Sequence, residues 1–148
     1  MLVVGVDPGL SGAIAWVMDG NILDAVDMPV MDGRVDAAAL SDLVIKHGTP
    51  DIVIVEKVGS MPGQGVASTF KFGQSYGTLL GVFGALKLPI MHVTPRKWKA
   101  SMGLSSDKEM ARARAIDTWP SSCDLFKRKK DHGRAEACLM AKWGQENA

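Results

Sequence analysis

Apolar and polar positions along this chain follow two patterns, short continuous apolar runs and helical spacing. The first pattern fills residues 2–6, where Asp7-Pro8-Gly9 ends the run, and it returns in residues 13–18 and near residues 22–28. Between the last two runs, Asp19-Gly20-Asn21 is a hairpin turn signal. Runs of this length predict strands, and short connections favour antiparallel pairing. The chain therefore begins with three predicted antiparallel strands.

Helical spacing comes next, followed by the most strand-like segment of the sequence. Asp36 is suited to the N-cap of a helix, apolar positions continue at helical spacing as far as His47, and Gly48 is suited to the C′ position. Residues 52–55 are a continuous run of branched aliphatic side chains that ends at Glu56. Such a run predicts a central strand covered on both faces.

The remaining elements are mostly helical. They are a Gly-rich loop over 57–67, a helix over 68–86, a short strand over 89–93, a helix that Ser106 and Glu109 open as a capping box and that ends near Trp119, and a last helix over 133–146. The predicted order is βββαβαβαα. We expect one α/β domain over residues 1–148, with a mixed five-stranded sheet, its first three strands antiparallel, and helices on both faces.

The predicted helix 68–86 has an unusual composition. Four glycines recur every three or four residues and share one face: Gly73, Gly77, Gly81 and Gly84. Each costs about 1 kcal/mol in an exposed helix interior, and together they form a face that a strand or another helix can approach closely. The other positions carry large apolar side chains nearly all round: Phe70, Phe72, Tyr76, Leu79, Leu80, Val82, Phe83 and Leu86. This predicts burial on more than one side, as in a contact between two copies of the chain.

Composition excludes several classes of protein. With 148 residues, 47% of them hydrophobic, the chain is able to bury a core without disulfides and is not disordered. It has two cysteines without a CxxC pair, and we identify no signal-like segment, which predicts a reducing, cytoplasmic location. No apolar run approaches the ~20 residues of a membrane helix, so no membrane partner is expected. The tryptophans are expected to be core or interface anchors: Trp16, Trp98, Trp119 and Trp143.

The small net charge of +1 conceals an asymmetry. Residues 1–86 carry four basic and nine acidic groups, whereas residues 87–148 carry thirteen basic and seven acidic groups. The latter include the run Lys127-Arg128-Lys129-Lys130, just before the last predicted helix. A cationic rim beside an acidic pocket suits a polyanion held over bound metal. Taken alone, the run is equally consistent with a solvated loop.

Three acidic residues occupy apolar surroundings. Asp7 ends the first predicted strand, Glu56 ends the most apolar one, and Glu136 interrupts an apolar stretch of the last helix. A buried carboxylate costs several kcal/mol unless it is paired or metal-bound. Carboxylate oxygens are hard ligands suited to Mg²⁺ or Mn²⁺, and the sequence lacks the Cys and His spacing of a zinc site. If the strands ending at Asp7 and Glu56 are neighbours, these side chains form a divalent-metal site.

Four segments, in this order, resemble the RuvC family of Holliday junction resolvases, and most of all its small bacteriophage-type members: Gly5-Val6-Asp7-Pro8-Gly9, Val55-Glu56-Lys57-Val58, Phe72-Gly73-Gln74-Ser75-Tyr76-Gly77 and Ala135-Glu136-Ala137. The resemblance extends from residue 3 to about residue 143. It implies a ribonuclease H-like fold, a homodimer and paired symmetric nicks in four-way DNA junctions. It also implies two Mg²⁺ ions per site, with Mn²⁺ as a substitute, that orient the attacking water and stabilise the leaving 3′ oxygen. A phage-encoded member would act in the cytoplasm of a bacterial host.

The resemblance implies three catalytic metal ligands, Asp7, Glu56 and Glu136. The family's fourth ligand lies one helical turn before the last of these, but Gly133 stands there. On a regular helix, His132 is about 40° from Glu136 and Asp131 is about 140° from it, which favours His132. An irregular first turn would instead let Asp131 supply the harder ligand. We take Asp131 as the metal ligand and keep His132 as a nearby or proton-transferring catalytic group.

The resemblance also places cationic groups near the scissile phosphate. The predicted DNA-binding residues are Lys99, Lys108, Lys127, Arg128, Lys129 and Lys130. The loop after Glu56 departs from the family pattern, because Gly59-Ser60-Met61-Pro62 stands where an aromatic wedge is expected. Base preference and the way in which the junction centre is opened are therefore not predicted.

Two other functions remain compatible with these residues. The same fold and carboxylates would serve a less selective nuclease that cuts flaps, replication forks or RNA–DNA hybrids. A chain that kept only the fold would be a non-catalytic nucleic-acid-binding protein. The three intact acids argue against the second, because acids repel phosphate and do not help a binding protein.

Overall fold

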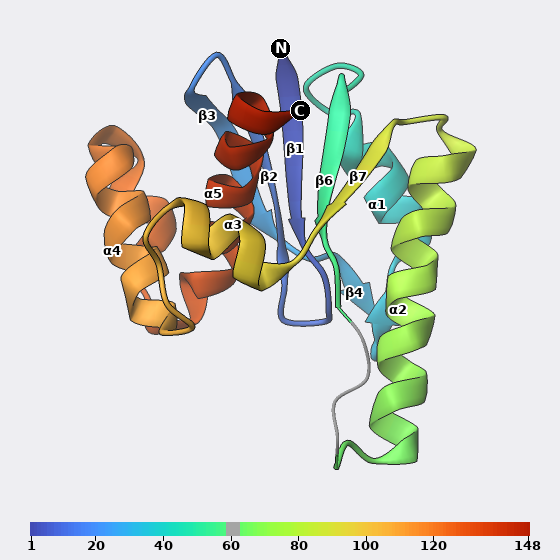
Figure 1. Ribbon diagram of the computed structural model, residues 1–148. Coiled ribbons are helices and arrows are strands. Elements are labelled where there is room, and N and C mark those ends of the chain that lie inside the picture. The colour runs from blue at the N-terminus through green and yellow to red at the C-terminus, as the bar shows by residue number, and fades with distance from the viewer. Residues whose placement is uncertain (59–62) are drawn as a thin grey trace.

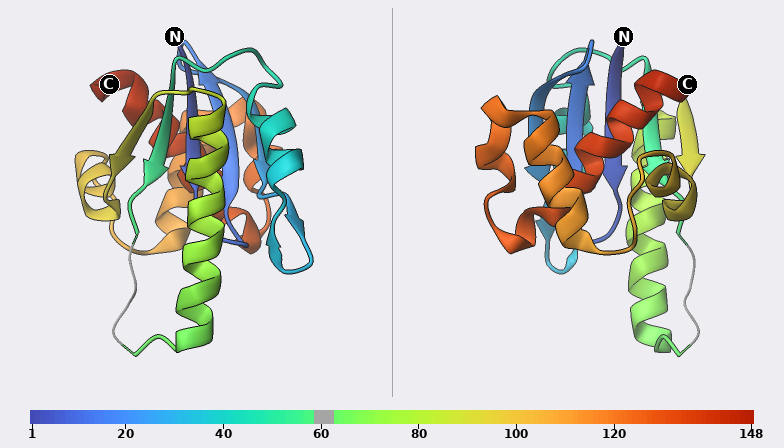
Figure 2. Two further views of the ribbon diagram at one scale, coloured as in Figure 1. Left: turned by 90° about the vertical axis from the view of Figure 1, so that its right-hand side faces the viewer. Right: turned by 60° about the vertical axis from the view of Figure 1, so that its left-hand side comes forward.

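A computed structural model describes residues 1–58 and 63–148 and shows a five-stranded sheet between two helical layers (Figures 1 and 2). Its strands are β1 (Leu2–Asp7), β2 (Ala13–Met18), β3 (Asn21–Asp27), β6 (Ile52–Glu56) and β7 (Ile90–Val93). The spatial order is β3-β2-β1-β6-β7. Strands β1, β2 and β3 pair antiparallel, while β6 runs parallel to β1 and β7 parallel to β6. The predicted mixed sheet is confirmed.

Helices cover both faces of the sheet, as predicted. Helices α1 (Ala37–Val44) and α2 (Val66–Ala85) lie on one face, and α3 (Pro95–Ser101), α4 (Lys108–Thr118) and α5 (His132–Asn147) lie on the other (Figure 1). Side chains alternate between the faces along a strand, so Val3 joins the core under α5 while Val4 joins the core under α1 and α2. Two hydrophobic cores therefore hold one sheet.

Helix α5 lies unusually close to β1. A Cβ atom on Gly5 would lie 2.1 Å from the main-chain oxygen of Ala137, a distance that no side chain tolerates. Glycine at this position lets the helix backbone rest directly on the strand. The first turns of α5 are thereby brought to the carboxyl end of β1.

The first helix is shorter than the apolar spacing predicts. Asp36 is the N-cap, as expected, and its carboxylate accepts from the main-chain N–H of Ala39 at 3.1 Å. The helix ends at Val44, however, and its continuation to His47 was wrong. The indole N–H of Trp16 donates to the carbonyl of Val44 at 3.2 Å, and His47 turns aside to Asp24 at 3.3 Å.

The sequence analysis did not predict several short elements. They are the hairpin β4 (Val30–Met31) and β5 (Arg34–Val35), helix α3, and the 3₁₀ segments η1 (Pro120–Phe126) and η2 (Lys129–Asp131). The predicted capping box of α4 was also wrong in its first residue. Asp107 is the N-cap in place of Ser106, and its carboxylate accepts from the main-chain N–H of Glu109 at 2.9 Å.

The glycine face of α2, defined by Gly73, Gly77, Gly81 and Gly84, is open within this chain. All four glycines are exposed, and a Cβ on any of them would meet no described atom within 4 Å. No described element of the same chain therefore makes the close approach that these glycines permit. The lower end of α2 extends past the strands (Figures 1 and 2), and Phe70 there is 70% exposed. None of the described helices is long and apolar enough to span a bilayer.

Candidate active site

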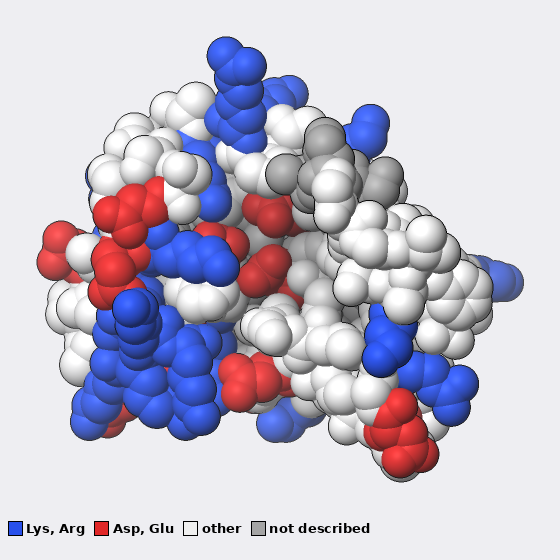
Figure 3. All heavy atoms as spheres, turned by 90° about the horizontal axis from the view of Figure 1, so that it is seen from below, with Lys and Arg blue, Asp and Glu red and all other residues white. Residues whose placement is uncertain are grey.

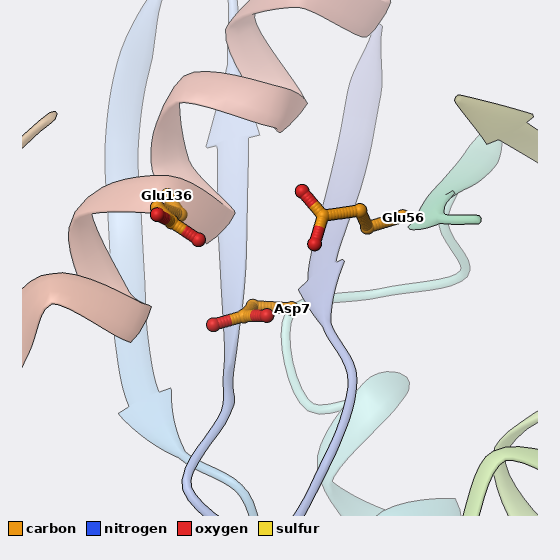
Figure 4. Close-up of side chains that lie close together, drawn as sticks. All are labelled: Asp7, Glu56 and Glu136. Atoms are coloured by element: carbon orange, nitrogen blue, oxygen red, sulfur yellow. The ribbon is translucent and has the colours of Figure 1, made fainter. Parts of the chain in front are cut away.

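Three carboxylates meet at the carboxyl ends of the parallel strands. Because Val6 of β1 pairs with Val55 of β6, the next residues, Asp7 and Glu56, lie side by side. Glu136 reaches them from the second turn of α5, and the three side chains point toward one another (Figure 4). One oxygen of each lies within 4.8 Å of the other two. The three carboxylates thus come together because β1 and β6 are neighbouring strands, the condition that the sequence analysis set for a metal site.

The group is buried and electrostatically unfavourable without a cation. Glu56 is 7% exposed and Glu136 5%. Burial raises the pKa of Asp7 well above its usual value, and the charges of Glu136 and Glu56 raise it further. Burial also raises the pKa of Glu56, against the effect of a hydrogen bond from Trp98. Such a site favours either protonation or a bound positive charge.

Helix α3 supplies two adjacent partners to these carboxylates. The indole Nε1 of Trp98 donates to Oε2 of Glu56 at 2.8 Å, and the ammonium of Lys99 lies 3.3 Å from Oε1 of Glu136. Lys99 was predicted near the site, whereas Trp98 was expected to be a core or interface anchor. The sequence Thr94-Pro95 could have revealed the helix, since a threonine N-cap followed by proline is a helix-start signal.

Comparison with known proteins identifies the fold that carries these residues. The chain superposes on Thermus thermophilus RuvC in complex with a Holliday junction substrate with a TM-score of 0.69 and 16% identity, over 99% of this chain and 97% of that one. The fold is that of RuvC. The fowlpox virus Holliday junction resolvase gives a TM-score of 0.64 and 16% identity, over 99% and 98% of the two chains.

Sequence comparison leads to the same group of proteins. A segment of 93 residues, 60% of this chain, is 32% identical to the chloroplastic Holliday junction resolvase MOC1 of Chlamydomonas reinhardtii. That match spans only 10% of the relative's length. No family model matches the chain. The resemblance to RuvC-type resolvases indicated by the four motifs is confirmed.

Asp131 does not join the group of three carboxylates. Both of its oxygens accept from Arg128, with the guanidinium Nη2 at 2.8 Å and the main-chain N–H at 2.8 Å. Burial alone would raise the pKa of Asp131, but these bonds outweigh it and the pKa is lowered. Asp131 is the last residue of η2, just before α5. Its carboxylate therefore binds Arg128 and fixes the segment that precedes the helix, instead of joining the three acids.

His132 lines the same cavity as three of the basic residues. Its Nδ1 atom is buried without a hydrogen-bond partner among the described residues, and the side chain lines a cavity together with Lys108. It is not one of the three residues whose ligand atoms lie together. Gly133 stands where the sequence analysis placed the family's fourth ligand. It lies close to Asp7, since a Cβ on Gly133 would be 3.2 Å from Oδ2 of Asp7.

The predicted DNA-binding residues divide into two sets. Lys108, Lys129 and Lys130 line one cavity of about 720 Å³, while Lys99 lines another of about 360 Å³, and both cavities include Ser106. Lys127 and Arg128 instead form ion pairs with Asp124 and Asp131, at 2.9 and 2.8 Å. Figure 3 shows basic side chains gathered beside a hollow that contains acidic ones.

Arg112 of α4 is a structural residue that the sequence analysis missed. Its guanidinium donates to the main-chain carbonyls of Phe126 and Lys127 at 3.1 and 2.7 Å, and it forms an ion pair with Glu109. These bonds hold the start of the basic segment 127–130 against α4, and the bonds between Arg128 and Asp131 hold its end.

The departure from the family pattern at residues 59–62 lies outside the described residues.

The raised pKa of Asp7 predicts how stability depends on pH. An unfolded aspartate has a pKa of about 3.9, and the folded value is higher. The stabilising contribution of this carboxyl is therefore complete below about pH 3.9 and is lost as the pH rises through the folded pKa. In EDTA near neutral pH, Asp7→Asn is expected to melt several degrees above wild type, with the difference shrinking toward pH 4. Thermal unfolding across this pH range tests it, and a variant that melts below wild type at neutral pH contradicts it.

Proposed function

We propose that this chain is a divalent-metal-dependent endonuclease that resolves four-way DNA junctions by paired nicks. The observation that carries the proposal is the convergence of Asp7, Glu56 and Glu136 at the carboxyl ends of two parallel strands in a RuvC fold. The similar proteins described as Holliday junction resolvases support the substrate class. A likeness of fold does not by itself establish activity, so the carboxylates carry the argument.

The three carboxylates fit a divalent cation. They offer hard oxygen donors within 4.8 Å of one another, and Asp7 has neither a hydrogen bond nor an ion pair from its side chain to any described residue. Oxygen donors of this kind suit Mg²⁺ or Mn²⁺. We propose two Mg²⁺ ions per site, which when bound supply Lewis-acid polarisation of the phosphate and an activated water.

Basic residues of the chain position the DNA around these acids. The ammonium of Lys99 is already at the carboxylate group, 3.3 Å from Glu136, with its side chain only 15% exposed. We propose that it binds a non-bridging oxygen of the scissile phosphate. Lys108, Lys129 and Lys130 in the neighbouring cavity would bind the adjacent phosphates of the same strand. These basic residues would thus hold one DNA strand over the three carboxylates.

A cleavage assay distinguishes the proposal from a less selective nuclease. The substrates are a four-way junction, a flap and a linear duplex, each with Mg²⁺ and with EDTA. We expect Mg²⁺-dependent cutting of the junction at symmetry-related positions and little cutting of the duplex. Equal cutting of flap and junction would favour the branched-DNA nuclease, and binding without cutting in Mg²⁺ would favour the non-catalytic protein.

We further propose a homodimer that is formed through the glycine face of α2. Within one chain this face is bare, with apolar side chains exposed at its lower end, Val66 at 88% and Phe70 at 70%. Glycines permit a second helix to approach closely, and the interior glycines otherwise destabilise the helix. A twofold axis beside α2 would present two sites to the opposed strands of a junction.

The dimer proposal predicts opposite effects of one substitution on the fold and on assembly. In Gly77→Leu, the added side chain meets open space in the single chain and improves helix propensity by about 1 kcal/mol, so the fold is retained. It would block a second helix, however. Sedimentation should therefore give about twice the 15.8 kDa chain mass for wild type and the single mass for the variant. Lys71→Leu, exposed on α2 about 120° from Gly77, should stay dimeric, and a monomeric wild type contradicts the proposal.

The choice between Asp131 and His132 yields another prediction. Because Asp131 is held by Arg128, Asp131→Asn is expected to reduce stability by about 1–3 kcal/mol and to leave most activity at low temperature. His132 lies one turn before Glu136, and its buried Nδ1 has no partner within residues 1–58 and 63–148, so His132→Ala is expected to reduce cleavage by about 10–100-fold. Single-turnover rates and melting temperatures test both. A larger rate loss in Asp131→Asn would restore Asp131 as the ligand.

A further inference from the structure

Trp98 differs from two other buried tryptophans in what its indole binds. Trp16 and Trp119 donate to main-chain carbonyls, those of Val44 and Gly20. Trp98 is fully buried and donates to the carboxylate of Glu56 at 2.8 Å. A main-chain carbonyl is already fixed by the backbone, whereas a carboxylate on a flexible side chain is not. The bond from Trp98 therefore constrains a group that would otherwise be free to rotate.

Helix α3, which carries the donor, is held by the backbone on one side and by a side-chain contact on the other. Val93, the last residue of β7, pairs with Glu56, and α3 begins two residues later with Thr94 as its N-cap. The ammonium of Lys97 lies 5.8 Å from the ring centroid of Trp143, which joins α3 to α5. The indole is thus carried by a short helix tied to the strand beside Glu56 and to the helix that carries the third carboxylate.

Trp98 holds one oxygen of Glu56 and leaves the other available. Oε2 accepts from the indole, while Oε1 has no hydrogen bond or ion pair with any residue of the described ranges. The nearby ammonium of Lys99 is within ion-pair distance of Glu136. The orientation of the Glu56 carboxylate is therefore set by a single neutral donor, which does not neutralise its charge.

We propose that Trp98 is a positioning residue that sets the affinity of the site for its divalent ion by holding Glu56 with one oxygen presented to the metal. This rests on the proposed function, since it takes the carboxylate group to be a metal site. Hydrogen-bond partners behind metal ligands typically change metal affinity by about 10–100-fold when they are removed. Losing the indole N–H should therefore weaken metal binding without removing any ligand atom.

The test is a titration of metal-free protein with Mn²⁺, with the free ion followed by electron paramagnetic resonance. Trp98→Phe keeps an aromatic ring and removes the donor, and we expect it to bind Mn²⁺ at least about tenfold more weakly than wild type. Trp119→Phe is the matched control, because it removes an indole bond of the same 2.8 Å length outside the site. It should bind Mn²⁺ as wild type does. Unchanged affinity in Trp98→Phe would overturn the proposal.

Two further measurements separate positioning from a general packing defect. If Trp98→Phe does not fold, benzothienylalanine at position 98 preserves the shape of the indole without its N–H, and the same loss of Mn²⁺ affinity is expected. For the folded variant, saturating Mn²⁺ should restore most of the junction cleavage rate. A rate that stays low at saturation, with normal Mn²⁺ affinity, refutes the positioning role. A wild-type protein that binds Mn²⁺ but cuts no junction refutes the proposed function and leaves the affinity comparison intact.

Discussion

Asp7→Asn is expected to abolish junction cleavage while leaving junction binding unchanged or tighter. The substitution replaces a charged ligand at the centre of the carboxylate group. Metal chemistry at a phosphate contributes several kcal/mol, so the rate should fall by about a thousandfold or more, at about 1.4 kcal/mol per tenfold. Binding should not suffer, because one negative charge is removed next to the DNA phosphates. Single-turnover cleavage and a gel-shift titration measure the two effects.

Asp19→Asn is the matched control for this experiment. Asp19 follows β2 at the opposite end of the sheet from Asp7, and its side chain is 76% exposed. The substitution removes the same charge without touching the site, so cleavage should stay close to wild type. Substantial cleavage by Asp7→Asn would remove Asp7 from the mechanism, and equal losses in both variants would point to the overall charge.

Gly5→Ala is expected to have the largest effect on stability. The added Cβ would lie 2.1 Å from the main-chain oxygen of Ala137 and 2.8 Å from the main-chain nitrogen of Ala141. Backbone atoms cannot turn away as a side chain does, so α5 must move off β1. Overpacking of this kind costs about 3 kcal/mol or more, which is about 10 °C in melting temperature for a chain of this length. Displacement of α5 also carries Glu136 away from Asp7, so cleavage should fail as well.

Gly84→Ala is the comparison, since it makes the same chemical change at a helical glycine with free space around it. No described atom lies within 4 Å of a Cβ at this position, and alanine is the better helix former by about 1 kcal/mol. Measured in the Gly77→Leu background, where the dimer proposal leaves no second chain against this face, its melting temperature should therefore equal or exceed that of the background. If Gly5→Ala melts like Gly84→Ala, the close packing of α5 on β1 is not required.

The sequence by itself determined the elements whose signal is local. Apolar runs located the five strands of the main sheet, and Asp36 marked the start of α1, because the cap hydrogen bond depends only on neighbouring residues. Strands only two residues long, such as β4 and β5, were missed, because so short a segment shows no apolar run. The bounds of α1 and the N-cap of α4 were wrong where a tertiary hydrogen bond or a competing side chain decided them.

For the site, the sequence identified the acids, and only the tertiary structure brought them together. Asp7 and Glu56 were recognisable because a carboxylate after an apolar strand is costly without a partner, but their contact depends on β6 pairing with β1. Glu136 reaches them because Gly5 lets α5 lie on the sheet. Asp131 bonds to Arg128, a local pair three residues apart that the sequence analysis did not consider, whereas Trp98 bonds to Glu56, which lies 42 residues away and which no spacing along the chain indicates. Local patterns predict which residue types stand at the ends of helices and strands. Contacts between distant elements depend on the order of strands in the sheet and on close packing, and these are set only when the chain folds.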